Sequence, residues 1–230
     1  ECYENLTQDL AEKAIYEAIR KDCNIIFTTT PEFVKASVQA AIDHPNVKIL
    51  NCSLNTSHRY IRTYYARMYE AKFLMGAVAG AMSENGQLAY IADYPIFGTI
   101  ANINAFALGA KMINPRARVY LEWSTLKDVD IRLAMENVQK KGVTVVSGKD
   151  MVIPEDASRY FGLYHLTEEG PHNLAMPLWH WGKFYEQLIR TIMDGTWKYD
   201  DNKDETKAIN YWWGLSAEVI DVIYSQKLPI

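Results

Sequence analysis

The sequence predicts an α/β protein in which short buried strands alternate with helices. Short, mainly apolar runs such as 24–27, 47–50 and 88–92 are typical of strands that are covered on both faces. Segments with apolar residues at i, i+3 and i+4 spacing separate these runs, as in amphipathic helices. The two patterns together indicate parallel sheets sandwiched by helices, in a chain whose 230 residues exceed the usual size of one domain.

Local signals place the elements in order. Apolar spacing behind a polar cap predicts a helix over 7–22, and Pro31 suits the start of a second helix over 33–42 after the strand at 24–27. The remaining predicted elements are strand 47–50, helix 67–82, strand 88–92, helix 100–112, strand 119–123, helix 129–140, strands 143–147 and 160–164, and helix 181–194. The polar stretches 51–62 and 198–207 are interpreted as lobe crossings or surface insertions.

Composition and charge exclude several classes of protein. Hydrophobic residues make up 49% and charged residues 23%, which is typical of a globular chain. A net charge of -4 provides no basic surplus for nucleic acid. The spacing of the Cys and His residues matches no zinc site, so no metal is expected. The apolar run 73–82, flanked by Lys72 and Glu84, is shorter than the roughly 20 residues of a membrane span and predicts a core helix.

Motifs of catalysis are missing from the sequence. It contains no G-x-G-x-x-G, no P-loop and no G-x-S-x-G, the glycine-rich turns that hold phosphates or a nucleophile in this fold class. A Ser/His/Asp hydrolase is the alternative, but the chain lacks the nucleophile turn. We therefore expect no enzyme activity and no cofactor.

Aromatic and polar side chains follow several predicted strands, where ligands of open α/β sheets bind. An aromatic plus hydrogen-bonding set of this kind suits a planar, neutral ligand such as a heterocyclic base. The alternative for each residue is a loop side chain that bonds nearby backbone, and for Trp123 it is a core position. The residues that follow strands are Thr28, Thr29, Thr30, Phe33, Asn51, Ser53, Asp93, Tyr94, Pro95, Phe97, Trp123, Ser124, Thr125, Asp128, Ser147, Gly148, Lys149 and Asp150.

Nearly the whole chain resembles one family. The segments that carry the likeness are 64–80, 90–95, 102–110, 114–115, 194–197 and 212–214. In this order they resemble the basic membrane protein (Bmp, PnrA-like) family of substrate-binding lipoproteins of ABC transporters, closest to its purine-binding or adenine-binding branch. The resemblance implies a type I periplasmic-binding fold of two lobes. Residues 1–82 would form the remainder of the first lobe with a crossing helix, 83–180 the second lobe, and 181–230 a crossing helix and the return to the first lobe.

The function implied by this resemblance is capture of a purine base or nucleoside between two lobes, without catalysis, for an ABC permease in the membrane. The protein would lie at the extracellular membrane face or in the periplasm, lipid-anchored in its full-length precursor. The alternative is a ligand-sensing regulatory module of the same fold. Phe33 and Trp123 would stack on the ligand, Tyr94 and Pro95 would shape the wall, and Asp150 would provide a polar contact. The full expected set is Thr29, Thr30, Phe33, Asn51, Tyr94, Pro95, Trp123, Asp128, Lys149, Asp150 and Trp181.

The chain departs from the nucleoside-binding branch at two places. Where that branch has aspartates that suit ribose hydroxyls, this chain has residues 51–53 and 162–165, which contain no carboxylate. The ligand is therefore left open between a free base and another small molecule. Only residues 1–6 precede the first predicted helix, so we also expect that the first strand and helix of the lobe are missing. Such a lobe would expose a sheet edge and self-associate through it.

Overall fold

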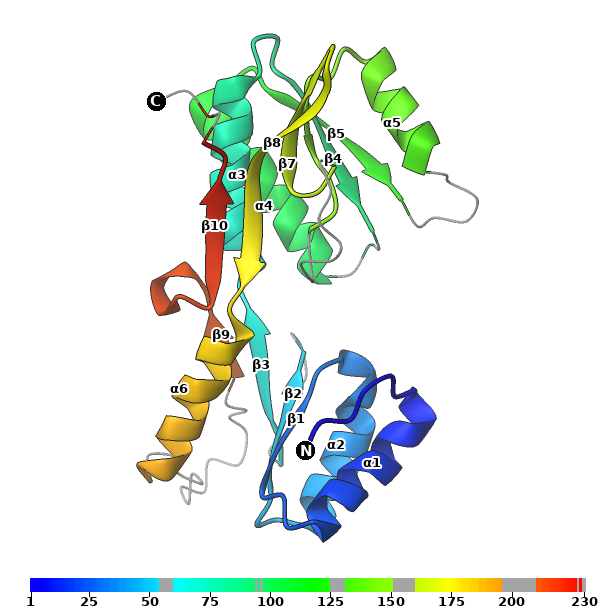
Figure 1. The fold of residues 1–230 in the computed structure, drawn as a ribbon, viewed down its shortest axis with the longest axis vertical. Helices are drawn as coiled ribbons and strands as arrows, with labels where there is room; N and C mark the ends of the chain where they lie inside the picture. Colours follow the sequence, from blue (N-terminus) through cyan, green and yellow to red (C-terminus); the bar gives the residue numbers. More distant parts are fainter. Residues whose placement is uncertain are drawn as a thin grey trace. The chain divides into compact units, whose positions relative to one another are not determined.

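The chain forms two compact units, each with its own sheet (Figure 1). The computed structural model describes residues 1–53, 60–93, 95, 97–124, 131–150, 160–195, 210–226 and 228. Unit 1 comprises residues 1–65 and 188–212, and unit 2 comprises 66–187 and 213–230. The predicted α/β class with two lobes is confirmed.

The sheet of unit 1 has the strand order β1-β2-β3-β9. Its first three strands are parallel, with Phe27 opposite Leu50 and Asn51 opposite Thr63. This register brings the carboxyl ends of β1 and β2 to the same edge. The elements are α1 (Gln8–Arg20), β1 (Ile25–Thr28), the 3-10 turn η1 (Pro31–Phe33), α2 (Val34–Asp43), β2 (Lys48–Cys52), β3 (Arg62–Ala66) and β9 (Asn210–Trp213).

Two helices bury their apolar faces against this sheet. Ile15 of α1 and Ala40 and Ala41 of α2 form one core cluster with Ile49 of β2 and Ile61. Each of these side chains is at most 4% exposed. This packing fixes the positions of β1 and β2, and with them the polar residues that follow the two strands.

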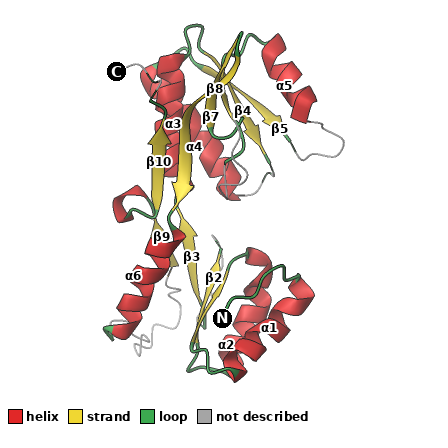
Figure 2. Cartoon of the chain, in the orientation of Figure 1, coloured by secondary structure: helices red, strands yellow, loops and turns green. Residues whose placement is uncertain are grey.

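The sheet of unit 2 has the order β10-β8-β7-β6-β4-β5 (Figure 2). Its strands β4, β5 and β6 are parallel, whereas β7, β8 and β10 are each antiparallel to the strand beside them. The sheet is therefore mixed, not uniformly parallel as expected from sequence. The strands are β4 (Gln87–Ala92), β5 (Arg118–Trp123), β6 (Val145–Ser147), β7 (Leu163–Thr167), β8 (Gly170–Trp179) and β10 (Ile220–Tyr224).

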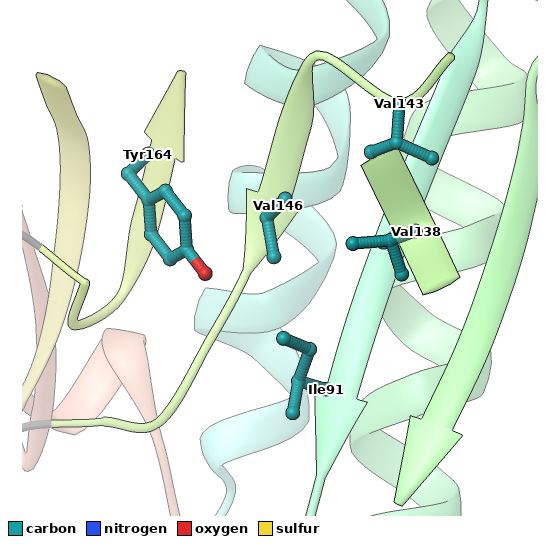
Figure 3. Packing of buried hydrophobic residues seen from close by; sticks show 6 residues of the cluster. Ile91, Val138, Val143, Val146 and Tyr164 are labelled. Carbon is teal, nitrogen blue, oxygen red and sulfur yellow. The ribbon is translucent and has the colours of Figure 1, made fainter. Parts of the chain in front are cut away.

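Helices cover both faces of this sheet. On one face, Val138 of α5 (Ile131–Lys140) packs against Ile91 of β4 and Val146 of β6, and Figure 3 shows these three side chains converging with Tyr164. On the other face, Tyr90 of β4 contacts the ring of Phe106 in α4. The other helical elements are α3 (Met68–Met82), α4 (Phe97–Ile113), α6 (Trp181–Met193) and the 3-10 turn η3 (Leu215–Ala217).

Four strands escape the sequence prediction, namely β3, β8, β9 and β10. β3 starts inside the polar stretch 51–62, where Arg62 donates to the Tyr211 hydroxyl of β9 at 2.5 Å. Polar side chains that pair with a neighbouring strand conceal the alternation that a half-buried strand usually shows. β8 contains Pro171 and Pro177. Because proline cannot donate a backbone hydrogen bond, its presence disfavours the prediction of a strand. The strand predicted at 160–164 forms at Leu163–Thr167 instead.

The units differ in extent from the predicted lobes. α3 belongs to unit 2, although the sequence interpretation places 1–82 together in the first lobe. Residues 213–230 also belong to unit 2, where β10 pairs with β8, whereas a return to the first lobe is expected from sequence. Within the described ranges, no helix has the length and apolarity required to span a membrane.

Candidate ligand-binding site

In unit 2, parallel pairing brings the carboxyl ends of three strands to one edge of the sheet. Ala92 at the end of β4 lies opposite Trp123 at the end of β5, and Tyr90 lies opposite Ser147 of β6. Ser124 closes the β5 end: its amide donates to the Ala92 carbonyl at 2.8 Å. Its hydroxyl donates to the carboxylate of the residue that follows β4, Asp93, at 2.9 Å. This edge is where open α/β sheets bind ligands.

A buried ion pair lies at this edge. The Lys72 ammonium of α3 donates to Oδ1 of Asp150, which follows β6, at 2.5 Å. The Lys72 side chain is 1% exposed and the Asp150 side chain is 16% exposed. Desolvation lowers the pKa of Lys72, but the attraction of Asp150 outweighs it, so the pKa lies above its ordinary value. Lys72 is therefore charged at neutral pH, and Asp150 is the group of the pair that reaches solvent.

Two further polar groups share the sheet face that α3 covers. Tyr90 is 4% exposed, and the Lys72 ammonium lies 5.4 Å from the centroid of its ring. Burial raises the pKa of Tyr90, so its hydroxyl stays protonated. Ser147, opposite Tyr90, is fully buried, and its hydroxyl has no hydrogen-bond partner in the described part of the chain. An unpaired buried hydroxyl is costly, so Ser147 is an available hydrogen-bonding group at this strand end.

Trp123 lies on this edge and outside the two core clusters described above. Its side chain is half-buried, and strand alternation puts it on the face opposite Tyr120, which packs against the α5 core. Its role as a site residue stays a prediction. Lys149 is exposed, with its ammonium 6.0 Å from the Phe161 ring centroid. Pro95 is exposed as well.

In unit 1, a hydrogen-bond network joins the carboxyl ends of β1 and β2. The Asn51 amide nitrogen donates to the Thr28 hydroxyl at 2.8 Å and to the Thr30 carbonyl at 2.9 Å. The Tyr64 hydroxyl donates to the Thr28 carbonyl at 3.2 Å. Ser37 donates to the Phe33 carbonyl at 2.8 Å and fixes the start of α2. The structure thus brings Asn51 and Thr30 together, with Phe33 at the adjacent start of α2, and their role in binding stays a prediction.

Asn51 leaves one atom of its amide without a partner. A carbonyl oxygen only accepts hydrogen bonds, so the Thr30 carbonyl requires the amide nitrogen on its side and fixes the orientation of the amide. Oδ1 is then buried with no hydrogen-bond partner among the described residues. It is a preoriented acceptor for an N–H group at the carboxyl end of β2.

Cys52 adjoins Asn51 but is unsuited to nucleophilic chemistry. Burial raises the pKa of its thiol to about 11, so the thiol stays protonated near neutral pH. The thiolate is the reactive form of cysteine. The group is therefore a small apolar side chain in this position.

A separate cavity of about 250 Å³ lies along the outer edge of β1 in unit 1. Its walls come from α1, from β1 and from the N-terminal segment, and Thr29 and Phe33 line it at one end. This volume is below the roughly 300 to 1,000 Å³ of most ligand pockets. Most of its lining comes from α1 and the N-terminal segment, and only Thr28 among its described walls bonds to the Asn51 side chain, so we do not assign the ligand to this cavity.

The remaining predicted residues are placed as follows. Trp181 begins α6 and stacks on Tyr185, with ring centroids 6.2 Å apart. It also meets Phe184 edge to face. Tyr94, Thr125 and Asp128 lie outside the described residues.

Sequence reasoning missed Lys72 as a site residue and treated it as a charge flanking an apolar run. The structure corrects this, because Lys72 lies on the buried face of α3 with Ala71, Met75 and Ala79. The spacing of Lys72 relative to the apolar residues of α3 could have revealed that it is buried. A lysine at i+4 from Met68 and i−3 from Met75 interrupts an apolar stripe, and a charge in such a stripe requires a buried partner.

Comparison with known families and proteins identifies the family of the chain. Residues 1–153 match the family described as ABC transporter substrate-binding protein PnrA-like. The chain is 26% identical to a purine-binding protein of Brucella abortus, covering 95% of this chain and 63% of that protein. It is also 26% identical to a Haloferax volcanii protein to which an ABC transporter glucose-binding role has been ascribed, covering 91% of this chain and 54% of that protein. The chain thus spans less than two thirds of either relative.

Solved structures share the fold at low sequence identity. A transcriptional activator of the comK gene from Bacillus halodurans superposes with a TM-score of 0.73 at 16% identity, covering 97% of this chain and 79% of the other. A solute-binding protein of an ABC transporter system from Conexibacter woesei gives a TM-score of 0.69 at 13% identity, covering 97% and 76% of the two chains. At these identities the likeness establishes the fold alone.

Proposed function

Because the chain belongs to the Bmp family of PnrA-like ABC transporter substrate-binding proteins, we propose that it captures a purine base for import without chemical change. The family is one of binding proteins, so no catalytic group is required. The observation that carries the purine assignment is the likeness to the Brucella purine-binding protein across 95% of the chain.

The polar groups at the strand ends support a base. Asn51 offers a preoriented carbonyl oxygen, and Asp150 offers a carboxylate whose other oxygen is held by Lys72. Within its own unit each group is a hydrogen-bond acceptor, and an acceptor suits an N–H group of a purine ring. Trp123, half-buried at the end of β5, supplies a surface on which a planar ring can stack.

A sugar ligand makes different demands. Sugar hydroxyls both donate and accept, and they are usually bound by several carboxylates and amides. The carboxyl end of β2 carries Asn51, Cys52 and Ser53, with no carboxylate. This residue set supports a free base over a nucleoside or over glucose.

In this proposal the complete protein acts outside the cytoplasmic membrane and delivers its ligand to an ABC permease. Family membership supports this location and this partner. A ligand-sensing regulatory role is the alternative, since a transcriptional activator shares the fold. Reconstitution of uptake with the permease distinguishes the two roles, because a sensor does not support uptake.

Calorimetric titration tests the ligand class. We expect adenine, guanine or hypoxanthine to bind more tightly than adenosine, and glucose to give no heat. Asn51→Leu should weaken purine binding about tenfold or more, because the ligand N–H loses its acceptor. Asn114→Leu, at a half-buried position near the end of α4, is the control. Saturable binding of glucose without purine binding contradicts the proposal.

A further inference from the structure

Lys72 occupies a position where the helix favours an apolar residue. The buried face of α3 is otherwise formed by Met68, Ala71, Met75, Gly76, Ala79 and Gly80. In the middle of this stripe the Lys72 side chain is 1% exposed, and its ammonium is bonded to the Asp150 carboxylate. Its charge must therefore act on a neighbouring group.

Stability is a poor explanation for this charge. Removing an ammonium group from water is costly, and a buried ion pair often stabilises a fold no better than apolar side chains of similar volume. A methionine at position 72 would continue the apolar stripe of α3. The charge is thus better explained by what it does to Asp150, its partner at 2.5 Å.

The contacts of the pair define its geometry. Lys72 binds Oδ1 of Asp150, and its ammonium lies 5.4 Å from the ring centroid of Tyr90, which comes from the neighbouring strand β4. The Tyr90 ring is in turn packed edge to face against Phe106 of α4. The ammonium thus lies between a carboxylate and an aromatic ring, and its bond to Oδ1 restrains the rotation of the Asp150 carboxylate. Asp150 keeps 16% of its side chain exposed, at the carboxyl end of the parallel strands.

We propose that Lys72 is a positioning residue, which holds the Asp150 carboxylate in one orientation as the acceptor for an N–H group of the bound base. This inference rests on the proposed function. Lys72 neutralises the charge of Asp150 from the protein side, so the pair presents a hydrogen-bond acceptor without excess negative charge. Ligands with an N–H at this edge are favoured, and ligands with a lone pair there are rejected.

A double-mutant cycle on the full chain tests the proposal with adenine, guanine and hypoxanthine as probes. The variants are Lys72→Met, Asp150→Asn and the pair of substitutions together. Lys72→Met should weaken binding of the tightest purine about tenfold when Asp150 is present, and less than about twofold in the Asp150→Asn background. This non-additivity arises because Lys72 acts on the ligand through Asp150. Lys72→Arg, which keeps the charge, should restore part of the affinity.

Two controls separate positioning from folding. Met75→Ala removes a buried side chain one turn along the same face of α3, so it should lower the melting temperature and leave purine affinity unchanged. Lys111→Met removes an exposed charge from α4 and should change neither property.

The outcomes distinguish the inference from the function on which it rests. If Asp150→Asn weakens binding but Lys72→Met does not, the positioning role is wrong and the proposed function stands. Equal losses from Lys72→Met with and without Asp150 also overturn the positioning role. If no purine binds to the unmodified protein, the proposed function fails first and the inference fails with it.

Discussion

Gly76 of α3 lies so close to Phe106 of α4 that a β-carbon at position 76 would be 2.1 Å from the Phe106 carbonyl oxygen. The approach is reciprocal, because a β-carbon at Gly109 would be 2.0 Å from the Phe73 carbonyl oxygen. Backbone atoms on both sides cannot move aside as a side chain can. The two glycines therefore allow α3 and α4 to pack backbone against backbone (Figure 1).

Gly76→Ala should lower the free energy of unfolding by about 1 to 3 kcal/mol or more, because the helices must separate to admit a methyl group. Urea unfolding measures this loss. Gly182→Ala is the matched control, since a β-carbon there meets nothing within 4 Å and alanine favours the helix. A Gly76→Ala variant as stable as the unmodified protein would mean that the helices are not this close.

The buried ion pair predicts an asymmetric response to truncation. Asp150→Ala leaves the Lys72 ammonium buried without its counter-charge and should cost about 3 to 5 kcal/mol of stability. Lys72→Met should cost clearly less, because Asp150 is 16% exposed and its carboxylate can turn to water. Thermal and urea unfolding of both variants show which of them loses more stability. Equal losses would contradict the burial of Lys72.

The helices and most of the parallel strands could be predicted from local pattern, but β3, β8, β9 and β10 could not. Helix α3 follows its apolar spacing to within one residue of the predicted start. β10 and β8 lie far apart in sequence and pair through long-range contacts that no local pattern reveals. Lys72 and Asp150 are likewise 78 residues apart, so their pairing depends on how α3 packs against the sheet. Asn51 and Phe33 could be named as candidates because they follow strands that local pattern predicts, and their role in binding stays a prediction.

Trp123→Ala should weaken binding of a purine by about 1 to 3 kcal/mol, the range for a base that stacks on an aromatic side chain. Stability should change little, because the side chain is half-buried. Titration and melting of the same samples measure both properties. Trp212→Ala, which removes a 37% exposed indole from β9, is the control and should leave affinity unchanged. A loss of about 3 to 5 kcal/mol in stability with unchanged affinity would show that Trp123 is a core residue and does not contact the ligand.

β1 is the end strand of its sheet and pairs with β2 along one side. Its other edge borders the cavity along α1. We expect this 230-residue chain to self-associate through that edge, since a free strand edge is a template for pairing. Light scattering at increasing concentration should show a rise in mass, which Ile25→Lys on β1 should suppress. A constant monomer mass would show that the edge is already covered.

Mass spectrometry of the small molecule that co-purifies with the native protein tests the central claim most directly. Gentle purification retains a tightly bound ligand, and denaturation releases it for identification. The account predicts a purine base, recovered chemically unchanged after incubation with the protein. Release of glucose, or conversion of an added purine to a new product, would contradict it.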